Sequence, residues 1–179
     1  MRLVIKFILL MFLAGCSQKS GYLLPTSQYG EITTTSVQVG VKKVETPSYL
    51  ASDKILVKEG IEVKEIGSNF LAPPSELLTN RAIRVLKTTL NNPNVLLYPW
   101  DVKSKKGYIV EIKLDKFMYD SGYAVVEGSY YIKRADGGLV VSKNFSKKIP
   151  TSKDAKSIVD NLSKLFDSVV IEIAQKIAK

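Results

Sequence analysis

Residues 151–179 read TSKDAKSIVDNLSKLFDSVVIEIAQKIAK, and this closing stretch decides the fold. Its apolar residues recur at spacings of three, four and seven, which places them on one broad stripe of an amphipathic helix. The stripe comprises Ala155, Ile158, Val159, Leu162, Leu165, Phe166, Val169, Val170, Ile173, Ala174 and Ile177. Thr151 and Asp154 have the spacing of a capping box. We therefore expect a helix of about 26 residues that packs against a sheet, with a partner-helix groove as the alternative for its stripe.

The residues before this helix alternate with a period of two, as strands with one buried face do. The apolar positions of the first two runs are Tyr108, Val110, Ile112 and Leu114, then Ala124, Val126, Tyr130 and Ile132. Asp136-Gly137-Gly138 is a tight-hairpin signal that leads into a third run at 139–141. The pattern predicts an antiparallel meander of three strands.

The elements further upstream are shorter. We expect a strand at 37–41, a hairpin over 54–66 that turns at Gly60, a helix that starts at Pro73-Pro74, and a strand at 95–98. In that helix the spacing places Leu78, Ala82, Val85, Leu86 and Leu90 on one face and Arg81, Arg84 and Lys87 on another. The chain is thus predicted to form a single α/β domain (α+β-like) over residues 37–179. Its mixed sheet contains the antiparallel meander and is flanked by two main helices.

The first sixteen residues, MRLVIKFILLMFLAGC, have the order of a secretory signal. Arg2 and Lys6 precede an apolar run that is too short to span a bilayer. Leu13-Ala14-Gly15-Cys16 matches the bacterial lipobox, in which cleavage before the cysteine is followed by acylation of that residue. We expect 1–15 to be a lipoprotein signal peptide and Cys16 to be the lipid attachment site. The alternative is an ordinary signal peptide with an incidental buried cysteine.

Residues 16–36 are predicted to be a lipidated N-terminus followed by a flexible tether, because 17–36 are rich in Ser, Thr, Gly and Gln. Within this region the apolar island Tyr22-Leu23-Leu24-Pro25 packs either onto the domain or onto a partner. Ser17, next to the lipidated cysteine, resembles the outer-membrane sorting class of lipoproteins. We expect a protein anchored in the outer membrane that faces the periplasm, with the inner membrane as the alternative.

The composition excludes most common catalytic chemistries. The 179 residues contain no histidine and one cysteine, which removes histidine-based triads, histidine-ligated metals and internal disulfides. No dinucleotide, phosphate-loop or nucleophile-elbow motif occurs. We therefore expect no enzyme activity, no catalytic or metal site and no cofactor other than the covalent lipid. The charge of +9 comes mainly from dispersed lysines, with four arginines, which is typical of a solvated surface and not of a nucleic-acid reader.

The arrangement of these motifs resembles the ABC-type transport auxiliary lipoprotein family, whose members are encoded with MCE-type transporters. The resemblance rests on the lipobox, the 22–25 island, the strand with Val39 and Val41, Pro47-Ser48-Tyr49-Leu50, the 77–90 helix, the meander and the closing helix. It implies a non-catalytic auxiliary or docking component of an MCE-type ABC lipid transport system between the inner and outer membranes. The implied partner is the MCE-domain protein of such a transporter.

Three apolar residues in expected loops, Tyr49, Leu50 and Phe70, are candidates for the partner-binding surface. The alternative for them is that they close the core at the edge of the sheet. A homo-oligomer is also compatible with the sequence. The competing functions are an outer-membrane biogenesis lipoprotein that braces a barrel protein, and a periplasmic carrier of hydrophobic ligands, which needs a large enclosed apolar cavity.

Overall fold

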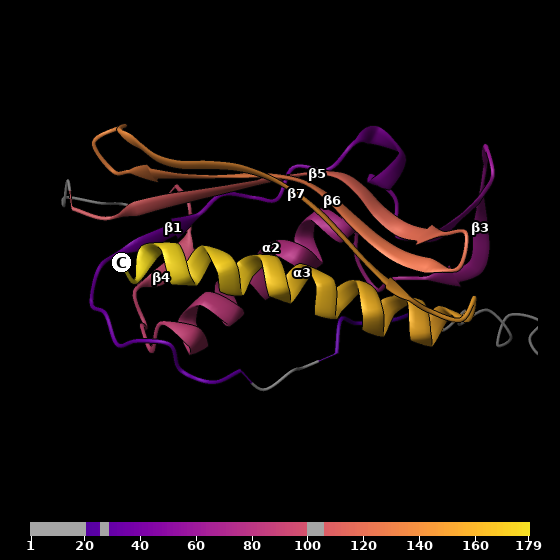
Figure 1. The fold of residues 1–179 in the computed structure, drawn as a ribbon, viewed down its shortest axis with the longest axis horizontal. Helices are drawn as coiled ribbons and strands as arrows, with labels where there is room; N and C mark the ends of the chain where they lie inside the picture. The colour runs from indigo at the N-terminus through magenta and orange to yellow at the C-terminus, as the bar shows by residue number, and fades with distance from the viewer. Residues whose placement is uncertain (1–20, 26–28, 100–105) are drawn as a thin grey trace, which may run out of the picture.

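The computed structural model describes residues 21–25, 29–99 and 106–179. Figure 1 shows their strands and helices along the chain. In order they are β1 (Val39–Val41), the short 3-10 helix η1 (Ser48–Leu50), β2 (Lys54–Glu59), β3 (Glu62–Asn69), α2 (Pro74–Thr89), β4 (Val95–Leu97), β5 (Tyr108–Asp120), β6 (Tyr123–Arg134), β7 (Leu139–Pro150) and α3 (Ala155–Ile177). This order confirms the predicted mixed α/β domain with a long C-terminal helix.

Strand β5 lies at the centre of a seven-stranded mixed sheet. On one side it pairs antiparallel with β6, which pairs antiparallel with β7, so the predicted meander is confirmed. On its other side β5 pairs parallel with β1 near its start and with β2 near its end. Strand β4 extends the sheet beyond β1, and β3 extends it beyond β2. The two ends of β5 therefore carry different edge strands, β4 at one end and β3 at the other.

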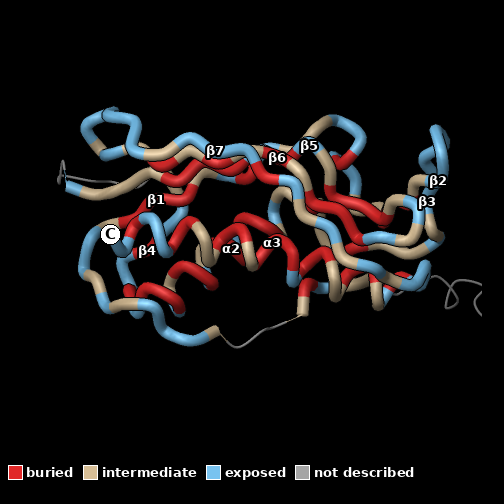
Figure 2. The backbone as a smooth tube through the Cα atoms, in the orientation of Figure 1, coloured by how far each residue is buried: buried red, intermediate tan, exposed pale blue. Residues whose placement is uncertain are grey.

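Helices α2 and α3 lie on the same face of the sheet, as Figure 1 shows. The apolar stripe of α3 is buried along its length, with Phe166, Val169 and Ile173 fully inaccessible. Leu78, Ala82, Val85, Leu86 and Leu90 of the α2 region are buried as the spacing predicted. Figure 2 shows these buried positions between the two layers, while the opposite face of the sheet is open to solvent over much of its area.

Helix α3 begins later than the capping-box spacing predicted. Its N-cap is Asp154, whose carboxylate accepts a hydrogen bond from the Ser157 backbone N–H at 2.9 Å. The Thr151 hydroxyl instead accepts from the side-chain amide of Asn161 at 2.9 Å. Aspartate is as good a cap as threonine, and the strand β7 extends to Pro150, so the chain turns into the helix three residues later. The helix has 23 residues.

The folded unit begins upstream of the predicted boundary at residue 37. Leu24 is buried, and the Tyr22 backbone forms a parallel bridge with Phe70. The Ile32 backbone N–H donates to the Thr89 carbonyl at 2.8 Å. The predicted flexible tether is therefore in contact with the domain within residues 21–25 and 29–36, through backbone hydrogen bonds of Tyr22, Ile32, Thr33 and Thr35 and through the buried Leu24 side chain. Of the two alternatives for the 22–25 island, the structure shows packing onto the domain.

The edge strand β7 carries two lysines on the helix-facing side of the sheet. Lys143 and Lys147 lie opposite the inward-facing Tyr130 and Val126 of β6. Both ammonium groups pair with Glu172 of α3, at 2.5 and 4.0 Å. Inward-pointing charges on an edge strand discourage another strand from adding to it. Helix α3 thus both covers the sheet and fixes its outer strand.

Candidate partner-binding surface

Of the three predicted partner-binding residues, the structure buries two and leaves one on the surface. Leu50 and Phe70 are 1% and 3% exposed and belong to the core. The Phe70 ring lies 6.2 Å from the Phe117 ring, measured between centroids. The prediction that Leu50 and Phe70 bind a partner is therefore wrong. Both side chains pack into the hydrophobic core, where burying apolar surface stabilises the domain. Tyr49, at 43% exposed, remains on the surface.

Tyr49 is held over an irregularity in β5. The pairing of β5 with β6 shifts between Leu114 and Lys116, so Asp115 has no partner in the ladder. This β-bulge keeps Leu114 and Phe117 both facing the core, although their spacing is odd. The Tyr49 hydroxyl donates a hydrogen bond to the Asp115 carbonyl that the bulge leaves available. The ring is thus fixed in position while one side stays open to solvent.

Glycine at position 128 is required where β6 meets this bulge. A Cβ atom there would lie 2.1 Å from the Lys113 carbonyl oxygen, closer than any side chain permits. Gly128 is in register with Leu114, immediately before the shift. The tight approach of the two strands therefore depends on the missing side chain.

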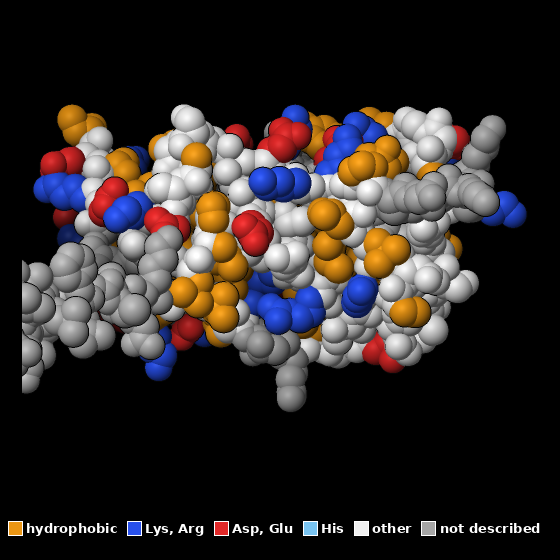
Figure 3. Space-filling view, turned by 180° about the vertical axis from the view of Figure 1, so that it is seen from behind, with side chains coloured by type: hydrophobic (Ala, Val, Ile, Leu, Met, Phe, Trp, Pro, Cys, Tyr) orange, Lys and Arg blue, Asp and Glu red, His pale blue; other side chains and the backbone are white. Residues whose placement is uncertain are grey.

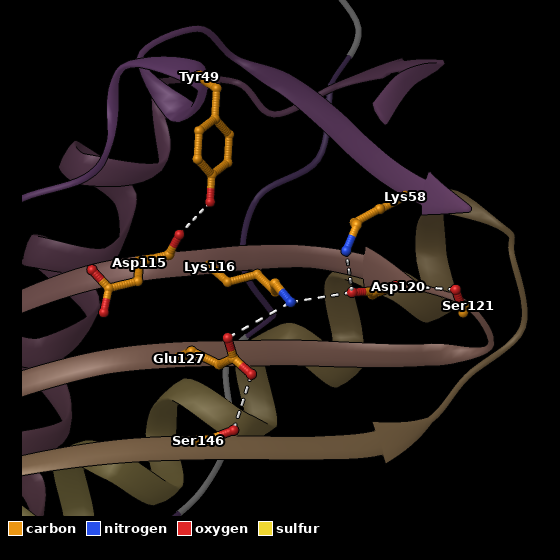
Figure 4. Close-up of polar contacts among 8 residues, drawn as sticks. All are labelled: Tyr49, Lys58, Asp115, Lys116, Asp120, Ser121, Glu127 and Ser146. Carbon is orange, nitrogen blue, oxygen red and sulfur yellow. Dashed lines mark hydrogen bonds and ion pairs between the residues drawn. The ribbon is translucent and has the colours of Figure 1, made fainter. Parts of the chain in front are cut away.

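Beside Tyr49, the open face of the sheet carries a charged network, shown in Figure 4. Lys116 of β5 contacts Asp120 at 3.1 Å and Glu127 of β6 at 3.6 Å. Lys58 of β2 contacts the same Asp120 carboxylate at 3.5 Å, and Ser146 of β7 donates to Glu127 at 3.0 Å. Four strands thus contribute to one continuous polar surface.

The pKa shifts of Asp120, Lys116 and Tyr49 favour the ordinary charge state of each group at neutral pH. Burial opposes the charge on Asp120, but hydrogen bonds from Lys116 and Ser121 outweigh it and lower the pKa of the carboxyl. Burial likewise opposes the charge on Lys116, and its contacts with Asp120 and Glu127 raise its pKa. Burial raises the pKa of the Tyr49 phenol, with Lys116 opposing the shift. The network presents fixed charges and a neutral phenol.

A second ionic cluster lies further along the same face. Glu111 of β5 is 9% exposed and contacts Lys42 at 2.6 Å and Lys133 of β6 at 2.9 Å. Burial opposes its ionisation, yet the hydrogen bonds from both lysines lower the pKa of Glu111. The Lys42 ammonium also lies 5.7 Å from the centre of the Tyr98 ring. The open face is therefore polar along β5 and offers charges of both signs.

This arrangement has features of a recognition surface. An exposed aromatic ring bordered by ordered charges is typical of a protein interface. A general acid at neutral pH needs a carboxyl with a raised pKa, whereas each shifted carboxyl among the described residues has a lowered one. Within the same residues, no three acidic or cysteine side chains are grouped to hold a metal ion.

The sequence reasoning missed a buried ionic cluster between the helices. Arg81 of α2 and Asp167 of α3 form a two-pronged ion pair, with both nitrogen–oxygen distances at 2.5 Å. The Tyr29 hydroxyl donates to the same carboxylate, and Arg81 donates to the Pro25 carbonyl. Arg81 was predicted on the polar face, but it lies three residues after Leu78 and four before Val85, and that spacing places it on the buried side. The cluster holds the N-terminal segment against both helices.

The predicted lipid attachment site, Cys16, and the predicted signal peptide lie outside the described residues. The prediction of acylation at Cys16 therefore rests on the lipobox alone. In the part of the chain that the structure covers, neither helix combines the length and apolarity needed to span a bilayer.

Three solved structures share this fold. A crystal structure of an uncharacterized protein aligns with a TM-score of 0.73 at 19% identity, covering 90% of this chain and 99% of its own. The DUF330 protein XCC0632 from Xanthomonas campestris aligns at 0.68 and 19% identity, covering 87% and 89%. The PelC dodecamer from Paraburkholderia phytofirmans aligns at 0.50 and 12% identity, covering 84% and 93%. These likenesses confirm the fold.

The sequence comparisons give the family. No curated protein matches the chain. The family model described as the ABC-type transport auxiliary lipoprotein component matches residues 22–174, which include every described strand of the sheet, both ionic clusters of the open face and nearly all of α3. The chain belongs to the family of ABC-type transport auxiliary lipoproteins.

Proposed function

We propose that the protein is the periplasm-facing docking component of an MCE-type ABC lipid transport system, anchored in the outer membrane through acyl groups on Cys16. The family match over residues 22–174 carries the proposal, because it describes an auxiliary lipoprotein of ABC-type transport. Lipid cannot cross the aqueous periplasm cheaply, since exposing each CH₂ group costs ~0.8 kcal/mol. A membrane-held domain that binds the end of a lipid conduit keeps that conduit beside the bilayer.

The open sheet face around Tyr49 is the proposed contact for the MCE-domain protein. The supporting observation is that Tyr49 stays 43% exposed although its hydroxyl is anchored on Asp115. An ordered aromatic side chain loses little entropy on binding, and Lys116, Asp120 and Glu127 supply charges that select a complementary partner. The contact thus combines an apolar anchor with a specifying polar rim.

The test is co-purification of the lipidated full chain with the MCE-domain protein, permease and ATPase of the proposed transport system. Tyr49→Ser should weaken capture of the MCE-domain protein by about tenfold, since an interface aromatic at the centre of a contact contributes more than 1 kcal/mol. The matched control is Tyr131→Ser, at a partly exposed tyrosine on β6 beside the second cluster. If folded Tyr49→Ser captures as much of the MCE-domain protein as folded wild type does, the contact with that protein lies elsewhere.

The two competing functions make different predictions in the same experiment. A barrel protein recovered in place of transporter subunits would favour the biogenesis function. A carrier would retain bound lipid chains that mass spectrometry identifies. The filled layer between α3 and the sheet, where Phe166, Phe117 and Tyr130 are at most 2% exposed, argues against a carrier cavity within the described residues.

Self-association is a further part of the proposal. The PelC dodecamer shows that a protein of this fold forms a homo-oligomer. Light scattering on the purified full chain measures the number of copies in solution. A strictly monomeric protein at every concentration tested would restrict the docking model to single copies.

A further inference from the structure

The N-terminal segment is fixed to the domain from Gly21 onward. The Tyr22 backbone N–H donates to the Asn69 carbonyl at 2.8 Å, and its carbonyl accepts from the Leu71 N–H at 3.0 Å. A Cβ atom at position 21 would lie 3.0 Å from the Asn69 carbonyl oxygen, so Gly21 itself packs closely against the end of β3. The chain therefore leaves the domain at the end of the molecule that carries β3.

The distance from this exit to the lipid attachment site is limited by the covalent chain. Gly21 follows Cys16 by five positions in the chain. A fully extended chain spans at most about 3.6 Å per residue, so the two positions lie within about 18 Å of each other whatever the conformation between them. If Cys16 is acylated, the β3 end of the domain stays close to the bilayer surface.

Exposed apolar side chains gather at this end. Leu23 is 61% exposed and Leu71 43%, and both flank Tyr22. At the tip of the β2–β3 hairpin, Ile61 is fully exposed and Val63 is 48% exposed. Figure 1 places this hairpin at the end opposite the C-terminus, and in Figure 3, seen from behind, a few hydrophobic side chains lie among charged ones at this end.

Three glutamates at this end are each paired with a lysine. Glu65, Glu62 and Glu59 pair with Lys54 at 3.4 Å, Lys64 at 2.8 Å and Lys153 at 2.8 Å respectively. In these pairs three lysines balance three glutamates, so the pairs carry no net positive charge that would attract anionic headgroups. We therefore expect apolar contact to supply the affinity of this end for a lipid surface.

We infer that the end of the domain formed by β3 lies against the bilayer, with Leu23, Leu71 and Ile61 in contact with lipid. This inference rests on the proposed acylation of Cys16 and adds to it the orientation of the domain. Strand β3 has eight residues, about 26 Å at the usual rise, so Leu71 and Ile61 both contact lipid when the strand lies along the membrane. The β6–β7 hairpin, at the other end, then points into the periplasm.

The test uses the acylated full chain in vesicles of phosphatidylethanolamine and phosphatidylglycerol. Because Cys16 is the single cysteine and its thiol is consumed by acylation, an introduced cysteine takes a fluorescent label uniquely. Leu71→Cys and Ile61→Cys report on the inferred contact. Val140→Cys is the matched control, since Val140 is 41% exposed at the opposite end of the molecule.

We expect quenchers on the lipid acyl chains to remove about half or more of the emission at positions 71 and 61 and almost none at 140, because the quenchers stay within the ~30 Å hydrocarbon layer. Equal quenching at all three positions, or quenching at neither 71 nor 61, overturns the inference. Quenching at 71 alone also overturns it, because β3 then stands away from the membrane.

Two further measurements separate the steps of the argument. Raising the phosphatidylglycerol fraction should leave the quenching at 71 unchanged; a steep rise would show an electrostatic contact and contradict the apolar one. Inserting a 20-residue Gly/Ser segment after Ser17 should reduce quenching at 71 and 61 toward the control, and unchanged quenching would contradict the inference that the short chain between Cys16 and Gly21 orients the domain. Mass spectrometry of Cys16 tells the failures apart: an unmodified thiol overturns the proposed anchoring, whereas acylation without quenching overturns the orientation alone.

Discussion

Two ionic clusters on opposite sides of the sheet show how differently the same side-chain chemistry is used. Between the helices, the side chains of Arg81 and Asp167 are 1% and 3% exposed and bind the N-terminal segment. On the open face, those of Lys116 and Asp120 are 24% and 18% exposed and lie beside Tyr49. A buried pair depends on both partners, whereas an exposed pair is screened and contributes little to stability. The first cluster therefore holds the fold together, and the second remains available to a partner.

Removing one partner of the buried cluster should have the largest effect. Asp167→Ala leaves the Arg81 guanidinium without its carboxylate inside the protein, and we expect a loss of about 3–5 kcal/mol in the free energy of unfolding. Asp120→Ala on the open face should lose less than about 1 kcal/mol. Urea denaturation measures both. The double variant Arg81→Met/Asp167→Leu should recover much of the lost free energy of unfolding. Equal losses for Asp167→Ala and Asp120→Ala would contradict the difference between the buried and the exposed cluster.

Two adjacent residues after the end of β3 give the same comparison, between a buried and an exposed position, for apolar side chains. Phe70→Ala removes a core ring packed on Phe117 and should cost about 3–5 kcal/mol. Leu71→Ala, one residue later and 43% exposed, should stay within about 0.5 kcal/mol of wild type. Thermal and urea unfolding of the two variants test this. A large loss for Leu71→Ala would mean that Leu71 supports the fold and not a surface contact.

A smaller effect is expected where the open face is fixed to the fold. Tyr49→Phe keeps the ring and removes the hydrogen bond to the Asp115 carbonyl, which should cost about 0.5–1.5 kcal/mol. The amide of Lys116, next to the bulge, should exchange with deuterium faster in this variant. Unchanged exchange there would show that the bulge does not need the hydroxyl.

The smallest expected effect is on how the stability of the domain depends on pH. The pKa of Glu111 is lowered in the folded state, so its stabilising contribution is complete above its ordinary value of about 4.5 and is lost as pH falls through the lower folded value. Glu111→Gln should therefore flatten the fall in stability below pH 4.5. Urea midpoints between pH 3 and 6 follow this slope, and Ser146→Ala, in the neighbouring network, is the control. A variant with the same slope as wild type would show that Glu111 does not carry the acid response.

The elements were predictable because their apolar periods were long and regular. The stripe of α3 and the alternation in β5 and β6 gave the correct layers, and Gly60 gave the β2–β3 turn. The bulge at Asp115 was not predictable, since it depends on how Gly128 approaches Lys113 across the sheet. Local spacing determines which face of an element is apolar; pairing between distant strands decides where the alternation changes.

The candidate surface was predicted in part. Tyr49 and Leu50 are adjacent in one turn, and the sequence gives no reason for one to be buried and the other exposed; the contact of η1 with the bulge decides that. Residues 29–36 have the composition of a linker. They nevertheless lie against the domain, because the Tyr29 hydroxyl donates a hydrogen bond to Asp167 and the Ile32 backbone N–H donates one to the Thr89 carbonyl. The cluster that binds them joins residues 138 positions apart, a distance that no local pattern reports.

The edge strand β7 restricts how copies of this protein can be arranged. Its lysines at 143 and 147 are committed to Glu172 under the sheet, and Pro150 lacks the N–H that a neighbouring strand would need at its end. A ring in which one copy's sheet runs on into the next is thus disfavoured on this side. A contact between copies made through this edge therefore uses side chains, and a copy bound there separates without breaking a shared ladder of hydrogen bonds.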